Sequence, residues 1–378
     1  MYLSMFLGPN VRGPEDDRLA LELSIEQALL ADAAGFAAVY LGEQHYNDYE
    51  PYSDPLVMAA HLAPQLTQAY LGTSMIPLPR HHPLALVERI NLLDQLSAGR
   101  CIIGMSSGRP VPDPSFPVPF PEGGAAQLFE EKLQVMLAAW VHRRADGPLA
   151  FETSTERGSM PNRMMPTNYR RGTPLWAIGT NTASKVHASG VLGRKIHTAG
   201  LDAAGTAKLM GVYRDGMTEG GIAAETVEEN LDWFLHTKVV FVGETDEEAA
   251  EAAAPMLIGR SLPPWIFTPP EQQGLQLVDL LRVDPGPMAS AMGQPESLAA
   301  FIQKTSIVGS PATVAARLQA FEDAGVRHSH IRFVFGSLAD PDLFRRSLRL
   351  FIDEVMPQLR TQTMPALRAD QVADHSGS

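Results

Sequence analysis

The chain has 378 residues, of which 45% are hydrophobic and 19% charged, a balance typical of a globular protein with a large buried core. Its formal net charge of -13 disfavours contact with phosphate backbones, so we expect no nucleic-acid partner. The one cysteine, Cys101, excludes an intrachain disulfide and a cysteine-rich metal site, and it fits a reducing compartment.

The beginning of the chain predicts a strand and not a leader. Its first eight residues are too few for a secretory signal peptide and lack the basic flank. No uncharged apolar stretch reaches about 18 residues, the length that a membrane span needs. We therefore expect a cytoplasmic protein without a membrane segment.

Strand-length apolar runs alternate with helical patterns in the first hundred residues. The helix expected over 17–34 places Leu21, Ile25 and Leu29 on one face and ends at Gly35. Asp54 and Pro55 open another helix, with the aspartate as cap and the proline in the first turn. The other elements expected here are strands at 1–8, 37–41, 70–75 and 101–105 and a helix at 83–97.

The rest of the chain repeats this order less evenly. Thr245 and Glu248 have the spacing of a capping box at the start of an alanine-rich helix. Ser310 and Pro311 open a helix that ends at Gly325. The other elements expected here are strands at 175–178, 195–199, 239–242 and 331–335, a short helix at 182–189 and a last helix through Phe351.

Strict strand-then-helix order predicts a parallel sheet with helical crossovers. Eight such units over this length favour an α/β fold with a single closed (β/α)8 TIM barrel over residues 1–360, followed by a disordered polar tail at 361–378. Three segments exceed ordinary connections and predict long insertions after strands four and seven, of the kind that form lids or binding loops. These segments are 106–123, 142–173 and 261–305.

Catalytic groups of such barrels follow the carboxyl ends of the strands. His45 comes just after the second strand among polar neighbours and suits acid–base chemistry near neutral pH, or simply a hydrogen bond that holds its loop. His81 and His82 precede a helix that opens with proline, and we interpret them as structural. No histidine and carboxylate spacing indicates a metal.

Small and hydroxyl residues lead from the fifth strand into a helix. The free N–H groups of a helix start, with hydroxyl side chains beside them, form a ready phosphate site, and plain N-capping explains the same residue types. No glycine-rich dinucleotide motif or Walker-type loop is present. The residues concerned are Gly179, Thr180, Asn181, Thr182 and Ser184.

Several motifs resemble the bacterial-luciferase family of flavin-dependent monooxygenases. The most specific part lies between residues 35 and 108, where 35–46 is similar to the family's second-strand motif and 91–100 to the approach to its fourth strand. The resemblance extends over about residues 1–360, and 261–305 matches nothing in it. Further matching positions are 71–73, His82-Pro83, 308–311, 324–326 and 355–357.

The resemblance implies a barrel that binds reduced FMN (FMNH2). The phosphate is expected at Gly179, Thr180, Asn181, Thr182 and Ser184. The third strand is expected to end in a non-proline cis peptide, Ser74–Met75, beneath the flavin ring. A reactive cysteine of the luciferase α subunit corresponds to Ser106, which is no obstacle to oxygenation.

Two positions depart from the family pattern. The first histidine of the second-strand pair, the usual acid–base candidate, is replaced by Gln44, which cannot exchange protons, so His45 is left with that role or none is needed. An arginine that helps to hold phosphate near the fourth helix is replaced within residues 125–127. Arg109, or Arg170 with Arg171, are the candidates to substitute for it.

The activity implied is oxygenation of a small organic substrate by O2 through a C4a-peroxyflavin. Because no nicotinamide motif is present, a separate flavin reductase is expected to supply FMNH2. A deazaflavin-dependent hydride-transfer oxidoreductase and a non-catalytic flavin-binding protein remain open. Relatives tend to form homodimers through the second and third helices, whose outward candidates here are Leu56, Met58, Leu84 and Leu86.

Overall fold

The computed structural model describes residues 1–9, 11, 13–46, 52–108, 119–261, 304–333, 341–365 and 369–373. Their contacts separate the chain into two compact units, and each is described by itself. Unit 1 comprises Met1–Ser24, Asn47–Pro51 and Thr180–Gln362. Unit 2 comprises Ile25–Tyr46, Tyr52–Gly179 and Thr363–Ser378.

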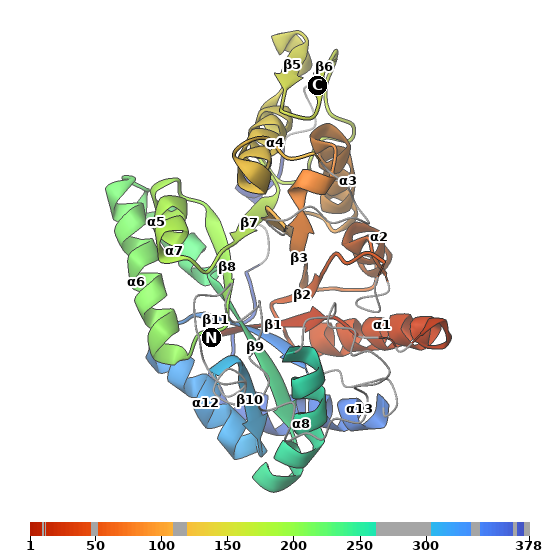
Figure 1. The fold of residues 1–378 in the computed structure, drawn as a ribbon, viewed down its shortest axis with the longest axis vertical. Helices are drawn as coiled ribbons and strands as arrows, with labels where there is room; N and C mark the ends of the chain where they lie inside the picture. Colours follow the sequence, from red (N-terminus) through yellow and green to blue (C-terminus); the bar gives the residue numbers. More distant parts are fainter. Residues whose placement is uncertain are drawn as a thin grey trace. The chain divides into compact units, whose positions relative to one another are not determined.

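Parallel strands form the centre of the fold (Figure 1). Their order is β9-β11-β1-β2-β3-β4-β7-β8, and β8 also pairs with β9, which closes eight strands into a barrel. The predicted (β/α)8 fold is thus confirmed. The eight strands are β1 Tyr2–Leu7, β2 Ala38–Leu41, β3 Tyr70–Pro77, β4 Cys101–Ser106, β7 Leu175–Gly179, β8 Lys195–Ala199, β9 Leu235–Val242 and β11 His328–Phe333.

One strand of the barrel sheet was not expected from the sequence. Strand β10, Ser306–Gly309, pairs in parallel with the second half of β9, from Val239 to Val242. The last barrel strand, expected at 331–335, begins earlier, at His328. Its first three residues, His328, Ser329 and His330, do not form an apolar run, which is why the sequence did not predict them as part of the strand.

The helices follow the strands in the order expected. The cap of α2 is confirmed, because the Asp54 side chain accepts a hydrogen bond from the Leu56 N–H at 2.9 Å. At the start of α8, the Thr245 hydroxyl accepts from the Glu248 N–H at 3.1 Å. The helices are α1 Asp17–Ala33, α2 Pro55–Leu62, α3 Pro83–Leu96, α4 Gly124–Val141, α5 Ala183–Val191, α6 Ala203–Glu219, α7 Ala224–Asp232, α8 Asp246–Ser261, α12 Pro311–Asp323 and α13 Pro341–Leu350.

In unit 2, the barrel strands are packed on both faces. All four residues of β2 are buried, as are the first five of β4. Gly72 of β3 lies against the ring of Tyr40, and a Cβ added at Gly72 would come within 2.2 Å of that ring. Only glycine therefore fits at this point, and its backbone leaves room for the large buried tyrosine.

In unit 1, the strands bury an unusual number of histidines. His197 of β8, His236 of β9 and both His328 and His330 of β11 are 5% exposed or less. The ring of His328 accepts from the Ser4 hydroxyl at Nε2 and donates from Nδ1 to the Asp232 carbonyl, at 2.5 and 2.8 Å. This assignment follows because a carbonyl can only accept.

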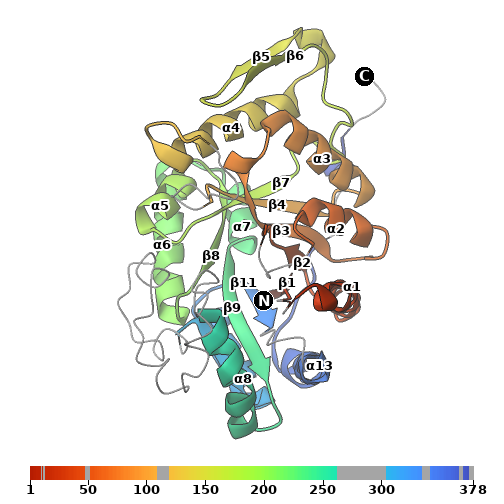
Figure 2. The same cartoon turned by 45° about the vertical axis from the view of Figure 1, so that its right-hand side comes forward.

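The segment 142–173, expected as a long loop, contains a β-hairpin in unit 2. Strands β5, Leu149–Glu152, and β6, Arg157–Met160, pair antiparallel. Figure 2 shows this hairpin beside α4, where the Ser154 hydroxyl and N–H both donate to Glu131. The other two expected insertions lie largely outside the described residues, at 109–118 and 262–303.

The expected disorder of the tail is wrong for part of it. In unit 1, the Gln362 N–H donates to the Met1 carbonyl at 2.9 Å. In unit 2, a short 3-10 turn at Ala369–Gln371 lies on the strand-four insertion, where the Ala373 N–H donates to the Tyr169 carbonyl at 2.8 Å. Backbone hydrogen bonding compensates for the polar composition that suggested disorder. Residues 366–368 and 374–378 lie outside the described part.

The surface helices of unit 2 correct the expected outward residues. Leu56, Met58 and Leu86 are 7% exposed or less and face the core, and Leu84 is half-buried. The side of α2 and α3 that faces the core is therefore not the one expected. The large apolar side chains that face outward on these two helices are Val57 at 68%, Leu92 at 50% and Leu96 at 51% exposed.

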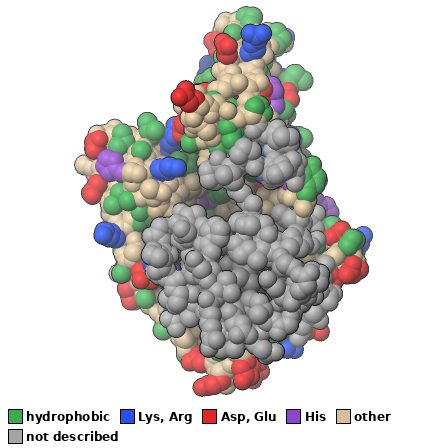
Figure 3. All heavy atoms as spheres, in the orientation of Figure 1, with side chains coloured by type: hydrophobic (Ala, Val, Ile, Leu, Met, Phe, Trp, Pro, Cys, Tyr) green, Lys and Arg blue, Asp and Glu red, His purple; other side chains and the backbone are tan. Residues whose placement is uncertain are grey.

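Two surface properties bear on partners. On the face drawn in Figure 3, the described Lys and Arg side chains lie apart and form no broad patch. Throughout the described helices, none has both the length and the apolar run needed to cross a bilayer.

Candidate functional site

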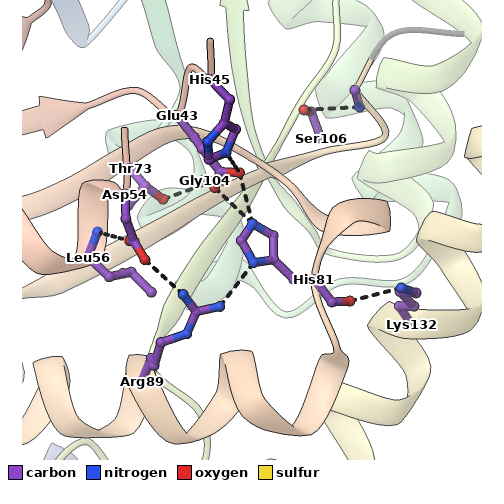
Figure 4. A network of polar contacts seen from close by, with 11 residues as sticks. Glu43, His45, Asp54, Leu56, Thr73, His81, Arg89, Gly104, Ser106 and Lys132 are labelled. Atoms are coloured by element: carbon purple, nitrogen blue, oxygen red, sulfur yellow. Dashed lines mark hydrogen bonds and ion pairs between the residues drawn. The ribbon is translucent and has the colours of Figure 1, made fainter. Parts of the chain in front are cut away.

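Polar side chains gather in unit 2 where strands β2, β3 and β4 end (Figure 4). Glu43 and His45 follow β2, the Ser74–Met75 step lies late in β3, and Ser106 is the last residue of β4. In β/α barrels this end of the strands holds the reaction centre. The positions are those that the strand order predicts.

Glu43 is the centre of this group. Its side chain is only 1% exposed, and a buried carboxylate requires hydrogen-bond partners. Two histidines provide them: His45 Nε2 lies 2.9 Å from Oε1, and His81 Nε2 lies 2.9 Å from both carboxylate oxygens. Gln44, between Glu43 and His45 in the chain, is half-buried.

His81 is a member of this polar group that the sequence interpretation missed. It directly follows the 3-10 turn Leu78–Arg80, and it was taken as structural because a proline-opened helix comes next. In the structure its second ring nitrogen, Nδ1, lies 2.9 Å from an Arg89 nitrogen. Arg89 in turn binds Asp54, at 2.9 Å. The only indication in the sequence was Glu43 itself, because a carboxylate placed directly after a buried strand needs hydrogen-bond partners.

Lys132 of α4 holds the backbone beneath His81. Its amino group donates to the His81 and Pro79 carbonyls, at 2.8 and 3.0 Å, and to Glu156 of the hairpin turn at 2.7 Å. The residue is 1% exposed. Burial alone would raise the pKa of Glu156, but hydrogen bonds from Lys132, Thr155 and Thr153 lower it below its ordinary value. A buried ion pair thus connects the hairpin to the His81 loop.

The Ser74–Met75 peptide bond is cis, as the resemblance implies. The β3–β4 pairing shifts register between Thr73 and Ile76, around this bond. The Met75 side chain lies beside Gly179, where an added Cβ would come within 3.1 Å of it. Gly179 therefore leaves space for Met75 at the end of β7.

The other expected residues of unit 2 have mixed outcomes. Ser106 is half-buried, and its Oγ accepts from the Gly108 N–H at 3.3 Å. Arg109 lies outside the described residues. Arg170 is wrong as a phosphate ligand at this end of the barrel, because it is buried against Asp94 and Tyr70, and Tyr70 is the first residue of β3.

In unit 1, the start of α5 fits an anionic group. The Thr180 Oγ is buried and has no hydrogen-bond partner among the described residues. Thr182 is the N-cap of α5 but makes no side-chain cap bond, and Ser184 is exposed in the first turn. Asn181 has a structural contact, because its Oδ1 accepts from the Ala199 N–H at 2.8 Å. An unpartnered hydroxyl and an uncapped helix start suit a phosphate.

Comparison with known proteins relates the chain to one family. A family model described as luciferase-like monooxygenase matches residues 1–328. Limonene 1,2-monooxygenase of Rhodococcus erythropolis is 36% identical over 104 residues, which are 28% of this chain and 27% of that protein. The first curated relatives are thus matched over only about a quarter of their length, 24% and 27%.

Solved structures show the same fold at low identity. The oxygenating component of 3,6-diketocamphane monooxygenase from Pseudomonas putida, in complex with FMN, has a TM-score of 0.72 at 19% identity, covering 96% of this chain and 100% of that one. An F420-dependent secondary alcohol dehydrogenase has a TM-score of 0.69 at 15% identity, covering 95% and 99%. A monooxygenase and an F420-dependent dehydrogenase thus share this fold.

Proposed function

Because the chain belongs to the luciferase-like monooxygenase family, we propose that it is an FMNH2- and O2-dependent monooxygenase acting on a small organic substrate. One oxygen atom enters the substrate, the other leaves as water, and reduced flavin supplies the two electrons. The observation that carries the proposal is the pair of histidines on the buried Glu43, at the carboxyl ends of the strands. Such a group can hold and move a proton where a barrel does its chemistry.

We assign one set of residues to flavin binding and His45 to proton transfer. Thr180, Thr182 and Ser184 of unit 1 would hold the flavin phosphate at the start of α5, and the family resemblance assigns Ser74–Met75 and Ser106 of unit 2 to the flavin ring. His45 is the acid–base group, since Gln44 cannot exchange a proton. When bound, reduced flavin activates O2. A separate flavin reductase is expected to supply the reduced flavin. Incubation with FMNH2, 18O2 and a panel of aldehydes, ketones and alkenes tests the activity, with 18O expected in the product.

The phosphate site predicts the effect of a double substitution. Replacing both Thr180 and Ser184 by alanine removes two hydroxyl donors at the start of α5, and reduced-flavin binding is expected to weaken about a hundredfold or more, because each hydrogen bond to a charged group contributes about 1.5–3 kcal/mol. Melting temperature is expected to change little, since the Thr180 hydroxyl has no partner in the described part of the chain. Anaerobic equilibrium dialysis measures the affinity, and an unchanged value would remove the phosphate from this position.

A deazaflavin-dependent hydride transfer is the second candidate, because an F420-dependent dehydrogenase shares the fold. A reduced deazaflavin passes hydride to its substrate without O2. Tight binding of F420 together with turnover in the absence of oxygen would favour this candidate. Tight binding of oxidised FMN with no oxygen consumption would favour a non-catalytic flavin-binding protein, to which Gln44 in place of histidine also points.

We also propose a homodimer through α2 and α3. Val57, Leu92 and Leu96 are at least half exposed there, and exposed apolar side chains on neighbouring helices suit a two-fold contact. Light scattering at micromolar concentration is expected to give the dimer mass for the wild type and the monomer mass for Leu92→Glu with Leu96→Glu. Leu192→Glu, at the end of α5, is the matched control. A monomeric wild type would refute the proposal.

A further inference from the structure

Arg89 determines which ring nitrogen of His81 carries the proton. An Arg89 guanidinium nitrogen lies 2.9 Å from His81 Nδ1. A guanidinium has only donors, so Nδ1 must accept, and the proton of the ring is then on Nε2. While this contact is present, His81 is neutral and can donate only from Nε2.

His81 Nε2 donates its proton to Glu43, which also accepts a hydrogen bond from His45. His81 Nε2 lies 2.9 Å from both oxygens of Glu43, and a carboxylate only accepts. His45 Nε2 lies 2.9 Å from Oε1 of the same carboxylate, so His45 donates from Nε2 as well. In a neutral His45, the nitrogen that can accept a proton is then Nδ1.

Two further contacts fix the position of Arg89 and His81. Asp54 Oδ2 accepts from Arg89 at 2.9 Å, while its other oxygen caps α2. The Lys132 amino group holds the His81 carbonyl at 2.8 Å. His81 is therefore held at both ring nitrogens and at its backbone, by groups from three separate parts of unit 2 (Figure 4).

We propose that Arg89 is a positioning residue that keeps Nδ1 of His81 unprotonated, so that His81 stays neutral and donates its one proton from Nε2 to the Glu43 carboxylate that also holds His45. The inference rests on the proposed function in one respect, namely that His45 moves a proton during the reaction. The tautomers are a property of the chain alone and can be measured without flavin or substrate.

Long-range 1H–15N NMR of the 15N-histidine-labelled protein tests this directly, because protonated and unprotonated ring nitrogens give separate signals. His45→Gln and His81→Gln assign the resonances. At pH 8, both histidines of the wild type are expected to carry the proton on Nε2. In Arg89→Met, Nε2 of His81 still donates to Glu43, and Nδ1, which has lost the arginine donor, is expected to move towards the protonated signal. Arg18→Met, which removes an exposed cation paired with Glu22, is expected to leave both histidines unchanged.

The kinetic arm measures what the tautomer does for turnover. Arg89→Met is expected to slow single-turnover product formation about 10–100-fold, the usual worth of an outer partner that orients a histidine, with FMNH2 affinity unchanged. Arg89→Lys keeps the charge but not the planar pair of donors that reaches both Asp54 and His81, and it replaces the Met variant if that does not fold.

A proton on His81 Nδ1 in the wild type would overturn the inference, as would histidine signals that do not change in the Arg89 variants. The expected tautomers in a chain that oxygenates nothing would leave the inference intact and count against the proposed function alone. The two can therefore fail separately.

Discussion

Replacing His45 by alanine is expected to leave reduced-flavin binding intact and to slow product formation by about 10²–10⁴, the usual worth of general acid–base catalysis. His45 is the histidine next to Gln44, and its Nε2 donates to the buried Glu43 at 2.9 Å, so Nδ1 is the nitrogen that can accept a proton in the neutral ring. Single-turnover kinetics with preformed enzyme–FMNH2 complex and O2 measure the effect.

His45→Gln separates proton transfer from loop structure. The glutamine amide can still donate to Glu43 but cannot exchange a proton at neutral pH. We expect it to restore the melting temperature of the wild type without restoring turnover. Turnover at the wild-type rate in His45→Gln would show that no titrating group is needed in this loop, and His45 would then have only a structural role.

Acid is expected to unfold the protein cooperatively as the pH falls from about 6.5 towards 4. Burial lowers the pKa of His197, His236 and His328 from 6.5 to about 3, and that of His330 well below its ordinary value. These rings are neutral when folded and take up protons when unfolded. Their stabilisation is complete above pH 6.5 and is lost as the pH falls towards the folded-state values.

The size of this effect follows from proton linkage. Each such histidine lowers the free energy of unfolding by up to about 1.4 kcal/mol per pH unit below its unfolded pKa, so four together give about 5 kcal/mol per unit. A typical domain has only about 5–15 kcal/mol of stability. Urea unfolding at a series of pH values between 8 and 4.5 measures the slope.

A matched pair of variants assigns the slope to the buried rings. His330→Gln is expected to reduce the pH dependence by about a quarter, since one of four groups is removed, at some cost in stability at pH 8. His61→Gln, at an exposed position on α2, is expected to leave it unchanged. A free energy of unfolding that stays constant from pH 7 to pH 5 contradicts the assignment.

The barrel could be predicted because its signals are local. Apolar runs of strand length, helical patterns with a period of 3.6 residues, the cap at Asp54 and the glycine stop at Gly35 each lie within one element. Strand β10, Ser306–Gly309, was missed because only its two central residues, Ile307 and Val308, are apolar. The outward residues of α2 and α3 were misassigned because most positions of these helices are apolar, so the sequence does not show which side faces the core.

The polar network could be predicted only in part. The position of His45 follows from strand order, whereas the pairing of Glu43 with His81 joins residues 38 positions apart. Nothing in the sequence near His81 indicates which of its ring nitrogens meets a carboxylate and which meets an arginine. Likewise, Arg170 looked like a free cation until the structure placed it against Asp94 at the start of the strands.

The proposed function requires that this chain bind reduced FMN and direct its reaction with oxygen into a substrate. The most direct measurement is an anaerobic titration with FMNH2, followed by rapid mixing with O2 while flavin reoxidation is recorded by absorbance. Tight binding and a reoxidation course distinct from that of free FMNH2, with less H2O2 released when a substrate is oxygenated, is the result predicted. Reoxidation identical to free FMNH2, or binding of reduced F420 in preference to FMNH2, would contradict it.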